Sequence, residues 1–224
     1  MKFINFSKIF LILIVPVLIF LLVFNFTGFS NSFFTKKFAQ YGVNNKFPDA
    51  GAMHQKVLNF IEGKSTELPS DFNEREKQHL LDVKRVISAL TITLYIMVGL
   101  FLLLLVVSAF TLKVNSYIIN FVGRVMMWGG ILTVGLAVLL FLFISMDFGQ
   151  AFESMHQMFF RSGTYMFDPA KEAIVNLYPE QLFMDLGISI SVWVIVAAVF
   201  LILVGFYLVL RTKKTKTIKR AGKL

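Results

Sequence analysis

Cysteine is missing from this 224-residue sequence, and charged residues are scarce. The absence of cysteine excludes disulfide bonds, thiolate metal ligands and a cysteine nucleophile. Charged residues make up 16% of the chain and hydrophobic residues 57%, a balance that is typical of membrane proteins. The net charge of +9 could indicate binding to nucleic acid or to anionic lipid, so the positions of the charges decide between these partners.

Four hydrophobic runs contain no charged residue, and they cover residues 9–28, 86–112, 125–146 and 186–210. Each has the roughly 20 residues that a helix needs to cross a hydrocarbon core of about 30 Å. None shows the polar stripe of a soluble amphipathic helix. We therefore predict an all-α membrane protein with four transmembrane helices. The first run could also be a signal peptide, but it is longer than the usual apolar region and no small-x-small site follows it, so we expect it to be retained.

The distribution of Lys and Arg predicts how the chain is oriented. The N-terminus, the loop 113–124 and the tail 211–224 carry 11 basic residues and no acidic residue. The positive-inside rule makes this side cytoplasmic. The other 11 basic residues and all 13 acidic residues lie in the outer segments 29–85 and 147–185. We expect a single multi-pass domain, 1–224, in the plasma membrane with both termini inside. The basic tail should anchor on anionic membrane lipids, with no role in nucleic-acid binding.

The two outer segments are predicted to form a small, mainly helical extracellular cap. Residues 49–61 are typical of a short helix with Asp49 as its N-cap. Asp71 and Glu74 have the spacing of a capping box, and the sequence contains no helix breaker from there to residue 112. Residues 147–161 resemble a helix lying in the membrane interface. A further short helix is expected at 170–177.

The three histidines all belong to the outer segments. His79 and His156 lie about seven residues, or roughly 10 Å along a helix, from the adjacent apolar runs, so both should reach headgroup depth. On a continuous helix Arg75, His79 and Asp82 share one face. Asp82 could then fix one imidazole nitrogen and leave the other as an acid or base. A solvated helix face is the alternative interpretation, and His54 is expected to be a surface residue.

Several chemistries lack their sequence signature. No Gly-x-Ser-x-Gly elbow and no His-Glu-x-x-His motif occurs, which disfavours those serine hydrolases and zinc peptidases. The spacing of the histidines and carboxylates does not indicate a metal site. No ionisable residue lies within the apolar runs, which disfavours ion-coupled transport. We therefore expect neither a metal nor a cofactor.

Two motifs in the outer segments resemble those of a known family. The first is Glu74-Arg-Glu-x-x-His79-Leu-x-Asp82 leading into a membrane helix. The second begins at His156-Gln-Met-Phe-Phe and continues through an aromatic residue, Asp168-Pro169 and Tyr178-Pro179-Glu180. Together they are similar to the bacterial lipoprotein intramolecular transacylases, four-helix membrane proteins of Gram-positive bacteria. The sequence has Tyr165 where many members are expected to have tryptophan.

This resemblance implies a definite reaction. The substrate would be a diacylglyceryl-modified lipoprotein with a free N-terminal cysteine, and one acyl chain would move from the sn-2 ester to the α-amino group. The product would be a lyso-form N-acyl lipoprotein. His79 and His156 would act as general acid and base on the extracellular face. The residues expected to orient them or to support an oxyanion are Glu74, Arg75, Asp82, Arg161, Tyr165 and Asp168.

Two alternatives remain open at the level of the sequence. A non-enzymatic membrane scaffold would not require His79 and His156 to lie near each other. A hydrolase or acyltransferase acting on phospholipids or lipoproteins would use the same histidines with a different acceptor.

Overall fold

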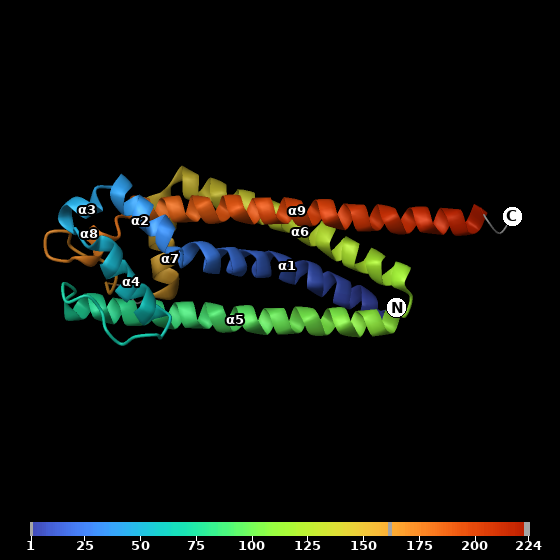
Figure 1. The fold of residues 1–224 in the computed structure, drawn as a ribbon, viewed down its shortest axis with the longest axis horizontal. Helices are drawn as coiled ribbons and strands as arrows, with labels where there is room; N and C mark the ends of the chain where they lie inside the picture. Colours follow the sequence, from blue (N-terminus) through green and yellow to red (C-terminus); the bar gives the residue numbers. More distant parts are fainter. Residues whose placement is uncertain (1, 161–162, 222–224) are drawn as a thin grey trace. The chain divides into compact units, whose positions relative to one another are not determined.

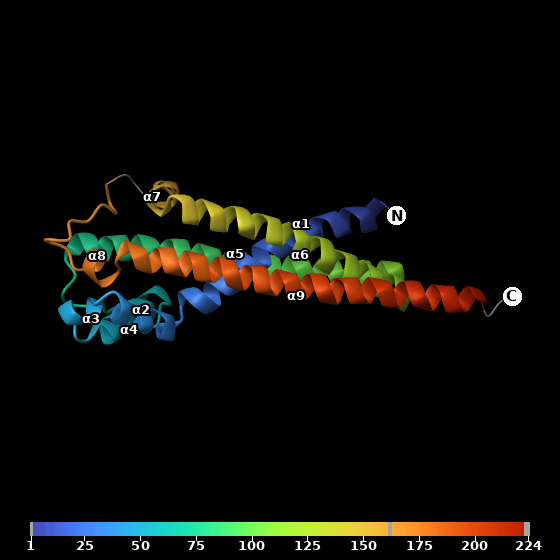
Figure 2. The same cartoon turned by 90° about the horizontal axis from the view of Figure 1, so that it is seen from above.

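The computed structural model describes residues 2–160 and 163–221, with side chains up to residue 213 at the C-terminal end. These residues form nine helices and no strand (Figure 1 and Figure 2). The all-α prediction is therefore confirmed. The helices are α1 (Lys2–Gly28), α2 (Asn31–Gln40), α3 (Val43–Lys46), α4 (Ala50–Ile61), α5 (Glu74–Leu112), α6 (Asn115–Met146), α7 (Phe148–Phe159), α8 (Ile174–Leu177) and α9 (Glu180–Ala221).

Four of these helices, α1, α5, α6 and α9, are long and apolar enough to cross a membrane. Each contains one of the four predicted apolar runs. Helix α5 has 39 residues, so its length is about 58 Å at 1.5 Å per residue, nearly twice the hydrocarbon thickness. It must therefore extend out of the hydrocarbon, and its first turns carry the polar residues that precede the apolar run.

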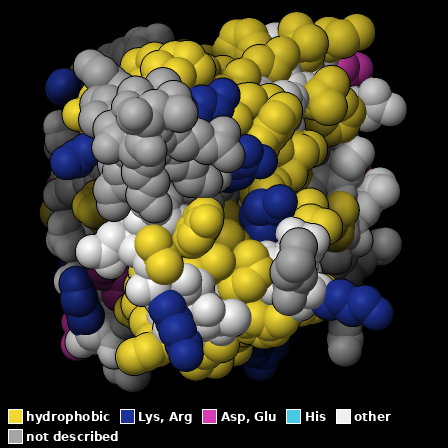
Figure 3. All heavy atoms as spheres, turned by 90° about the vertical axis from the view of Figure 1, so that its right-hand side faces the viewer, with side chains coloured by type: hydrophobic (Ala, Val, Ile, Leu, Met, Phe, Trp, Pro, Cys, Tyr) yellow, Lys and Arg dark blue, Asp and Glu magenta, His cyan; other side chains and the backbone are white. Residues whose placement is uncertain are grey.

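The chain divides into two compact units. Unit 1 comprises Met1–Val23, Thr93–Leu140 and Ser191–Leu224, and unit 2 comprises Phe24–Ile92 and Phe141–Ile190. Unit 1 contains 11 of the 22 Lys and Arg residues and none of the 13 Asp and Glu residues. Figure 3 views the end where α1 begins, and there Lys and Arg side chains lie among hydrophobic ones. All 13 acidic residues and all three histidines lie in the residue ranges of unit 2.

Small residues allow the helices of unit 1 to approach closely. A Cβ atom added to Gly205 of α9 would lie 2.6 Å from the carbonyl oxygen of Gly123 in α6. The hydroxyls of Ser7 and Ser108, both buried, lie 2.8 Å apart and join α1 to α5. Close backbone approach and interhelical hydrogen bonds are the main attractions available where the surrounding solvent is as apolar as the side chains.

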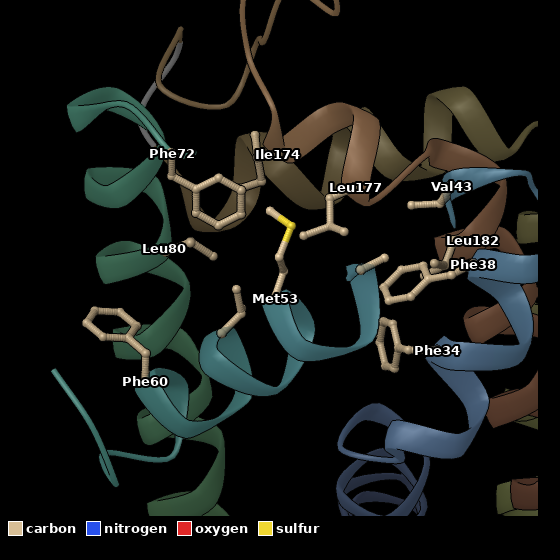
Figure 4. Close-up of a cluster of buried hydrophobic side chains, with 12 residues drawn as sticks. Phe34, Phe38, Val43, Met53, Phe60, Phe72, Leu80, Ile174, Leu177 and Leu182 are labelled. Carbon is tan, nitrogen blue, oxygen red and sulfur yellow. The ribbon is translucent and has the colours of Figure 1, made fainter. Parts of the chain in front are cut away.

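Unit 2 has its own hydrophobic core, shown in Figure 4. Met53 of α4 lies between Phe72, at the entry to α5, and the side chains of α8. Helix α2 is held to the start of α9 by Asp185, which accepts a hydrogen bond from Tyr41 at 2.6 Å and pairs with Lys37 at 2.5 Å. The core residues are Phe34, Phe38, Val43, Ala50, Met53, Val57, Phe60, Phe72, Leu80, Ile174, Leu177 and Leu182.

The structure corrects the predicted start of the long helix α5. The expected capping box of Asp71 and Glu74 is wrong, because α5 begins at Glu74. The reciprocal bonds are made two residues later, by Asn73 and Glu76. The Asn73 side chain accepts from the amide of Glu76 at 3.0 Å, and the Glu76 carboxylate accepts from the amide of Asn73 at 2.7 Å. The predicted continuity of the helix to Leu112 is confirmed.

Two other local predictions need adjustment. The helix expected at 170–177 is only Ile174–Leu177, because residues 168–171 form a turn in which the amide of Lys171 donates to the carbonyl of Asp168 at 2.9 Å. Helix α4 is confirmed, with Asp49 at the N-cap position, although the Asp49 side chain makes no capping hydrogen bond. Helices α2 and α3 had not been predicted.

Candidate active site

His79 lies in the second turn of α5 and faces the second outer segment. Its ring centroid is 5.0 Å from that of Phe160 and 5.3 Å from that of Phe167. The side chain is 8% exposed, and its Nδ1 atom is buried without a hydrogen-bond partner among the described residues. Since His79 precedes the apolar run of α5 by seven residues, it lies outside the part of the helix that spans the hydrocarbon.

His156 lies in the last turn of α7. This helix starts directly after α6, where the carboxylate of Asp147 accepts from the amide of Gln150 at 2.9 Å. The Nδ1 atom of His156 lies 2.8 Å from the carbonyl oxygen of Phe152. Because a carbonyl only accepts, Nδ1 must carry the hydrogen, and the neutral ring has its lone pair on Nε2. The backbone of α7 thus prepares one nitrogen of a buried histidine to act as a base.

The two histidines meet within unit 2. Their ring centroids are 6.3 Å apart and the ring planes differ by 16°. Phe160 contacts both rings, at 5.0 Å from His79 and 5.5 Å from His156, and Phe152 adds a contact to His156 at 4.2 Å. These contacts surround two imidazoles with aromatic side chains, a setting that excludes water and strengthens electrostatic interactions with a bound polar group.

Burial keeps both imidazoles neutral. It lowers the pKa of His79 from 6.5 to about 4, and repulsion from His156 adds to this effect while the charge of Asp82 opposes it. Burial also lowers the pKa of His156, opposed by the hydrogen bond to Phe152 and by the charge of Glu153. Both rings are therefore uncharged at neutral pH and able to accept a proton.

Arg75 makes several hydrogen bonds to the segment that follows α7. Its Nη1 donates to the carboxylate of Glu172 at 2.9 Å, and Nη2 donates to the carbonyls of Gly163, at 3.0 Å, and Met166. The guanidinium also lies 5.0 Å from the centroid of the Phe167 ring. Because Phe167 contacts His79, these bonds hold one of the aromatic walls of the histidine pair. Most of the donors of Arg75 are occupied, which favours an orienting role over oxyanion binding.

Glu76 joins the two outer segments. The side chain is 1% exposed, and one carboxylate oxygen accepts from the amide of Ile174 at 2.6 Å while the other accepts from the amide of Asn73. Glu74, which we had expected to orient a histidine, is instead exposed and pairs with Lys77 at 2.8 Å. The sequence motif contains both glutamates, and only the structure identifies Glu76 as the one that faces inward.

Tyr165 lies against His156, with the ring centroids 4.8 Å apart. Its hydroxyl donates to the carboxylate of Glu153 at 2.7 Å, and Gln157 donates to the same oxygen at 2.9 Å. These bonds lower the pKa of Glu153, and the bond to Glu153 raises the pKa of Tyr165. Glu153 was missed in the sequence, although its position three residues before His156 was a readable signal.

Asp82 and Asp168, two other predicted site residues, make their hydrogen bonds elsewhere. No hydrogen bond joins Asp82 to His79 within the described part of the chain; Asp82 pairs with Arg85 at 2.8 Å and affects His79 only through its charge. Asp168 caps a turn by accepting from the amide of Ala170 at 2.9 Å. Arg161 lies outside the described residues.

The prediction that His54 is a surface residue is wrong. Its side chain is 2% exposed and stacks on Phe34 with a centroid separation of 4.1 Å. Its Nδ1 lies 2.9 Å from the hydroxyl of Tyr178. Burial lowers the pKa of His54 from 6.5 to about 4 and raises the pKa of Tyr178. His54 is therefore part of the core of unit 2.

The chemistry available at this site is proton transfer to and from two neutral imidazoles. Among the residues that the structure describes, no group of three potential ligands is arranged to hold a metal ion. The histidine pair offers two imidazoles that can exchange protons with a bound molecule at a surface rich in aromatic rings. This combination suits acyl transfer in which the nucleophile belongs to the substrate.

Comparison with known proteins agrees with this chemistry. The family model described as lipoprotein intramolecular transacylase Lit matches residues 8–183. No curated protein matches the chain significantly.

The solved structures that resemble the chain include the membrane integral lipoprotein intramolecular transacylase Lit of Bacillus cereus. It is 16% identical, with a TM-score of 0.82, and the match covers 94% of this chain and 98% of that one. A variant of the same protein with a histidine replaced by arginine is also 16% identical, with a TM-score of 0.77 and coverage of 95% and 94%. The corresponding alanine variant matches at 16% identity with a TM-score of 0.77 and coverage of 94% and 96%. At this identity the likeness establishes the shared fold.

Proposed function

The chain belongs to the lipoprotein intramolecular transacylase family, and from that premise we propose that it moves one acyl chain within a diacylglyceryl-modified lipoprotein. The acyl chain would leave the sn-2 ester of the glyceryl group and form an amide with the α-amino group of the N-terminal cysteine. As a member of this family the protein is an acyltransferase, so the scaffold alternative is no longer needed. The observation that best supports the specific reaction is the contact between His79 and His156.

The proposed reaction needs no nucleophile from the enzyme. The amine and the ester belong to one molecule, so holding them in a reactive arrangement supplies much of the rate. A base must remove a proton from an ammonium with a pKa of about 8, and an acid must protonate the departing glyceryl oxygen. The ammonium loses its first proton to solvent, and a neutral histidine accepts the second as the amine attacks. The imidazolium formed in this way is the acid that protonates the glyceryl oxygen.

In this proposal the amine forms a C–N bond with the ester carbonyl, and the C–O bond to the glyceryl oxygen breaks as the tetrahedral intermediate collapses. One imidazole takes the proton from the attacking nitrogen. The unprotonated Nε2 of His156 is one base available for this step. The imidazolium gives this proton to the departing glyceryl oxygen, either directly or through the second imidazole, so that both imidazoles return to their neutral form. Arg161 remains a candidate donor for the oxyanion, and the bonds already made by Arg75 support an orienting role for that residue.

We further infer the orientation of the protein. The family and the four candidate spans make it an integral membrane protein. The absence of acidic residues from unit 1 supports placing both termini in the cytoplasm and unit 2 on the extracellular face of the plasma membrane. The substrate lipoprotein and the surrounding lipids would then be the partners of unit 2.

Mass spectrometry of the N-terminal lipopeptide tests this function. A diacylglyceryl-lipoprotein is incubated with the purified protein, and the fragment ions of the lipopeptide are compared before and after. We expect an unchanged total mass, with one acyl chain relocated to the cysteine nitrogen. Loss of one acyl mass would replace the proposal with hydrolysis. An unchanged fragment pattern across several lipoproteins would contradict it.

A further inference from the structure

The side chains behind His156 form an arrangement that general acid and base catalysis alone does not explain. The Tyr165 ring packs against the imidazole of His156, and the two ring centroids are 4.8 Å apart. Beyond that ring, the Tyr165 hydroxyl donates to Glu153 at 2.7 Å. Glu153 belongs to the same helix as His156, three residues earlier, so a carboxylate and an imidazole lie on adjacent positions of one helix face.

We propose that Glu153 and Tyr165 are a positioning pair for His156, in which Tyr165 fixes the plane of the imidazole and the ionised Glu153 stabilises the imidazolium that forms during proton transfer. This inference rests on the proposed function for its catalytic meaning. Its structural content, the effect of Glu153 and Tyr165 on His156, can be measured without any substrate.

The hydrogen bonds explain how the ring is held. The bond from Nδ1 of His156 to the Phe152 carbonyl, at 2.8 Å, restrains one edge of the imidazole. The Tyr165 ring covers part of the imidazole, and the bond to Glu153 determines where the Tyr165 ring can lie. Gln157 donates to the same Glu153 oxygen at 2.9 Å and keeps the carboxylate in place. The restrained ring presents Nε2 in one direction, as a base in a short proton transfer requires.

The charged and titratable groups around His156 explain how Glu153 can stabilise its imidazolium form. From α7 it is faced by Glu153, whose negative charge raises the pKa of His156 against the effect of burial. From α5 it is faced by His79, which is neutral because its own pKa is lowered to about 4. The segment after α7 contributes Tyr165, whose raised pKa keeps the hydroxyl protonated. Asp82 acts on His79, and Arg75 is paired with Glu172. Among the residues that the structure describes, Glu153 is the carboxylate whose charge acts on His156.

Nuclear magnetic resonance of the histidines tests the pair directly. The chain contains 3 histidines, so a sample labelled with ¹⁵N-histidine gives a simple spectrum that substitution of each histidine assigns. Glu153→Gln removes the charge and keeps an acceptor for Tyr165. We expect it to lower the titration midpoint of His156 and to leave those of His54 and His79 almost unchanged. Glu62→Gln is the matched control, because Glu62 pairs with Lys64 at the surface and belongs to a different segment from His156. An unchanged His156 midpoint in Glu153→Gln would overturn the electrostatic part.

Tyr165→Phe separates orientation from charge, because it keeps the aromatic ring and removes the hydroxyl. Loss of the hydrogen bond to the ionised Glu153, which holds the Tyr165 ring, should lower kcat/KM about 10-fold, with a smaller shift of the His156 midpoint than Glu153→Gln produces. In the same assay, Glu153→Gln should move the acidic limb of the pH profile to lower pH, because His156 protonates less readily. A purely structural role would change the amount of folded protein and leave the pH profile in place, and that result would contradict the proposal.

The two measurements also separate this inference from the proposed function. A shifted His156 midpoint in a protein that shows no acyl transfer would retain the positioning pair and reject the reaction. Normal acyl transfer with unchanged midpoints, pH profile and kcat/KM in both variants would retain the reaction and reject the pair.

Discussion

Replacing Glu76 with alanine should strongly weaken the connection between the two outer segments. The carboxylate of Glu76 is 1% exposed and accepts one hydrogen bond from Ile174 at 2.6 Å and one from Asn73 at 2.7 Å. Alanine removes both acceptors, and the buried amide of Ile174 has no water to replace its lost bond. Because the residues concerned lie at the start of α5 and of α8, the change should affect unit 2 first.

The expected magnitude follows from these two bonds. A hydrogen bond to a charged group contributes about 1.5–3 kcal/mol, so Glu76→Ala should lower the free energy of unfolding by about 3–6 kcal/mol. Each kcal/mol shifts the melting temperature of a chain of this size by about 2–4 °C. The melting temperature in detergent should therefore fall by roughly 6 °C or more. Glu74→Ala is the control, because the Glu74 side chain is 90% exposed and makes a surface pair with Lys77, which is worth less than about 1 kcal/mol.

Circular dichroism during heating gives the melting temperature, and hydrogen exchange followed by mass spectrometry gives the local effect. In Glu76→Ala the amide of Ile174 should exchange much faster than in the wild type, and in Glu74→Ala it should not. A melting temperature within about 2 °C of the wild type, together with unchanged exchange at Ile174, would refute the assignment of Glu76 as the connection.

Two further predictions concern acid and helix packing. The pKa of His54 is about 4 when buried and 6.5 when free, so the unfolded protein takes up the proton first as the pH falls. Between pH 6.5 and 4 the free energy of unfolding should therefore fall by about 3 kcal/mol through His54 alone. Chemical denaturation at several pH values should show this loss, and His54→Phe should make the plot of unfolding free energy against pH flatter. In unit 1, Gly205→Ala would place a Cβ 2.6 Å from the carbonyl oxygen of Gly123, whereas Gly135 has open space around it. Gly205→Ala should therefore lower the melting temperature while Gly135→Ala keeps or raises it, and equal effects of the two changes would show that this helix contact is not close.

The sequence predicted the features that depend on neighbouring residues. The four apolar runs identified the four long helices, because crossing hydrocarbon requires a continuous stretch of uncharged residues. The helix from Glu74 to Leu112 was correctly predicted as continuous, since nothing between these residues breaks a helix. The separation of charges between the two outer segments and the rest of the chain was also visible, and the division into units follows it.

The sequence could not predict features whose partners are far away along the chain. Glu76 and Glu74 are two residues apart in one motif. What distinguishes Glu76 is its bond to the amide of Ile174, which lies 98 residues later in the sequence. His54 was misinterpreted for the same reason, because its partners Phe34 and Tyr178 come from other helices. The helices at Asn31–Gln40 and Val43–Lys46 were missed although Ser30 is a good N-cap, with its hydroxyl accepting from Phe33 at 3.4 Å.

Acyl transfer by single-histidine variants tests the central claim most directly. Purified wild-type protein, His79→Asn, His156→Asn and the core variant His54→Gln are incubated with a diacylglyceryl-lipoprotein, and the N-terminal lipopeptide is fragmented in a mass spectrometer. We expect the wild type to move one acyl chain to the cysteine nitrogen without a change in total mass. Substitution of His79 or His156 should abolish this transfer in protein that remains folded, while His54→Gln should retain transfer in proportion to its folded fraction. Full transfer by either His79→Asn or His156→Asn would contradict the account.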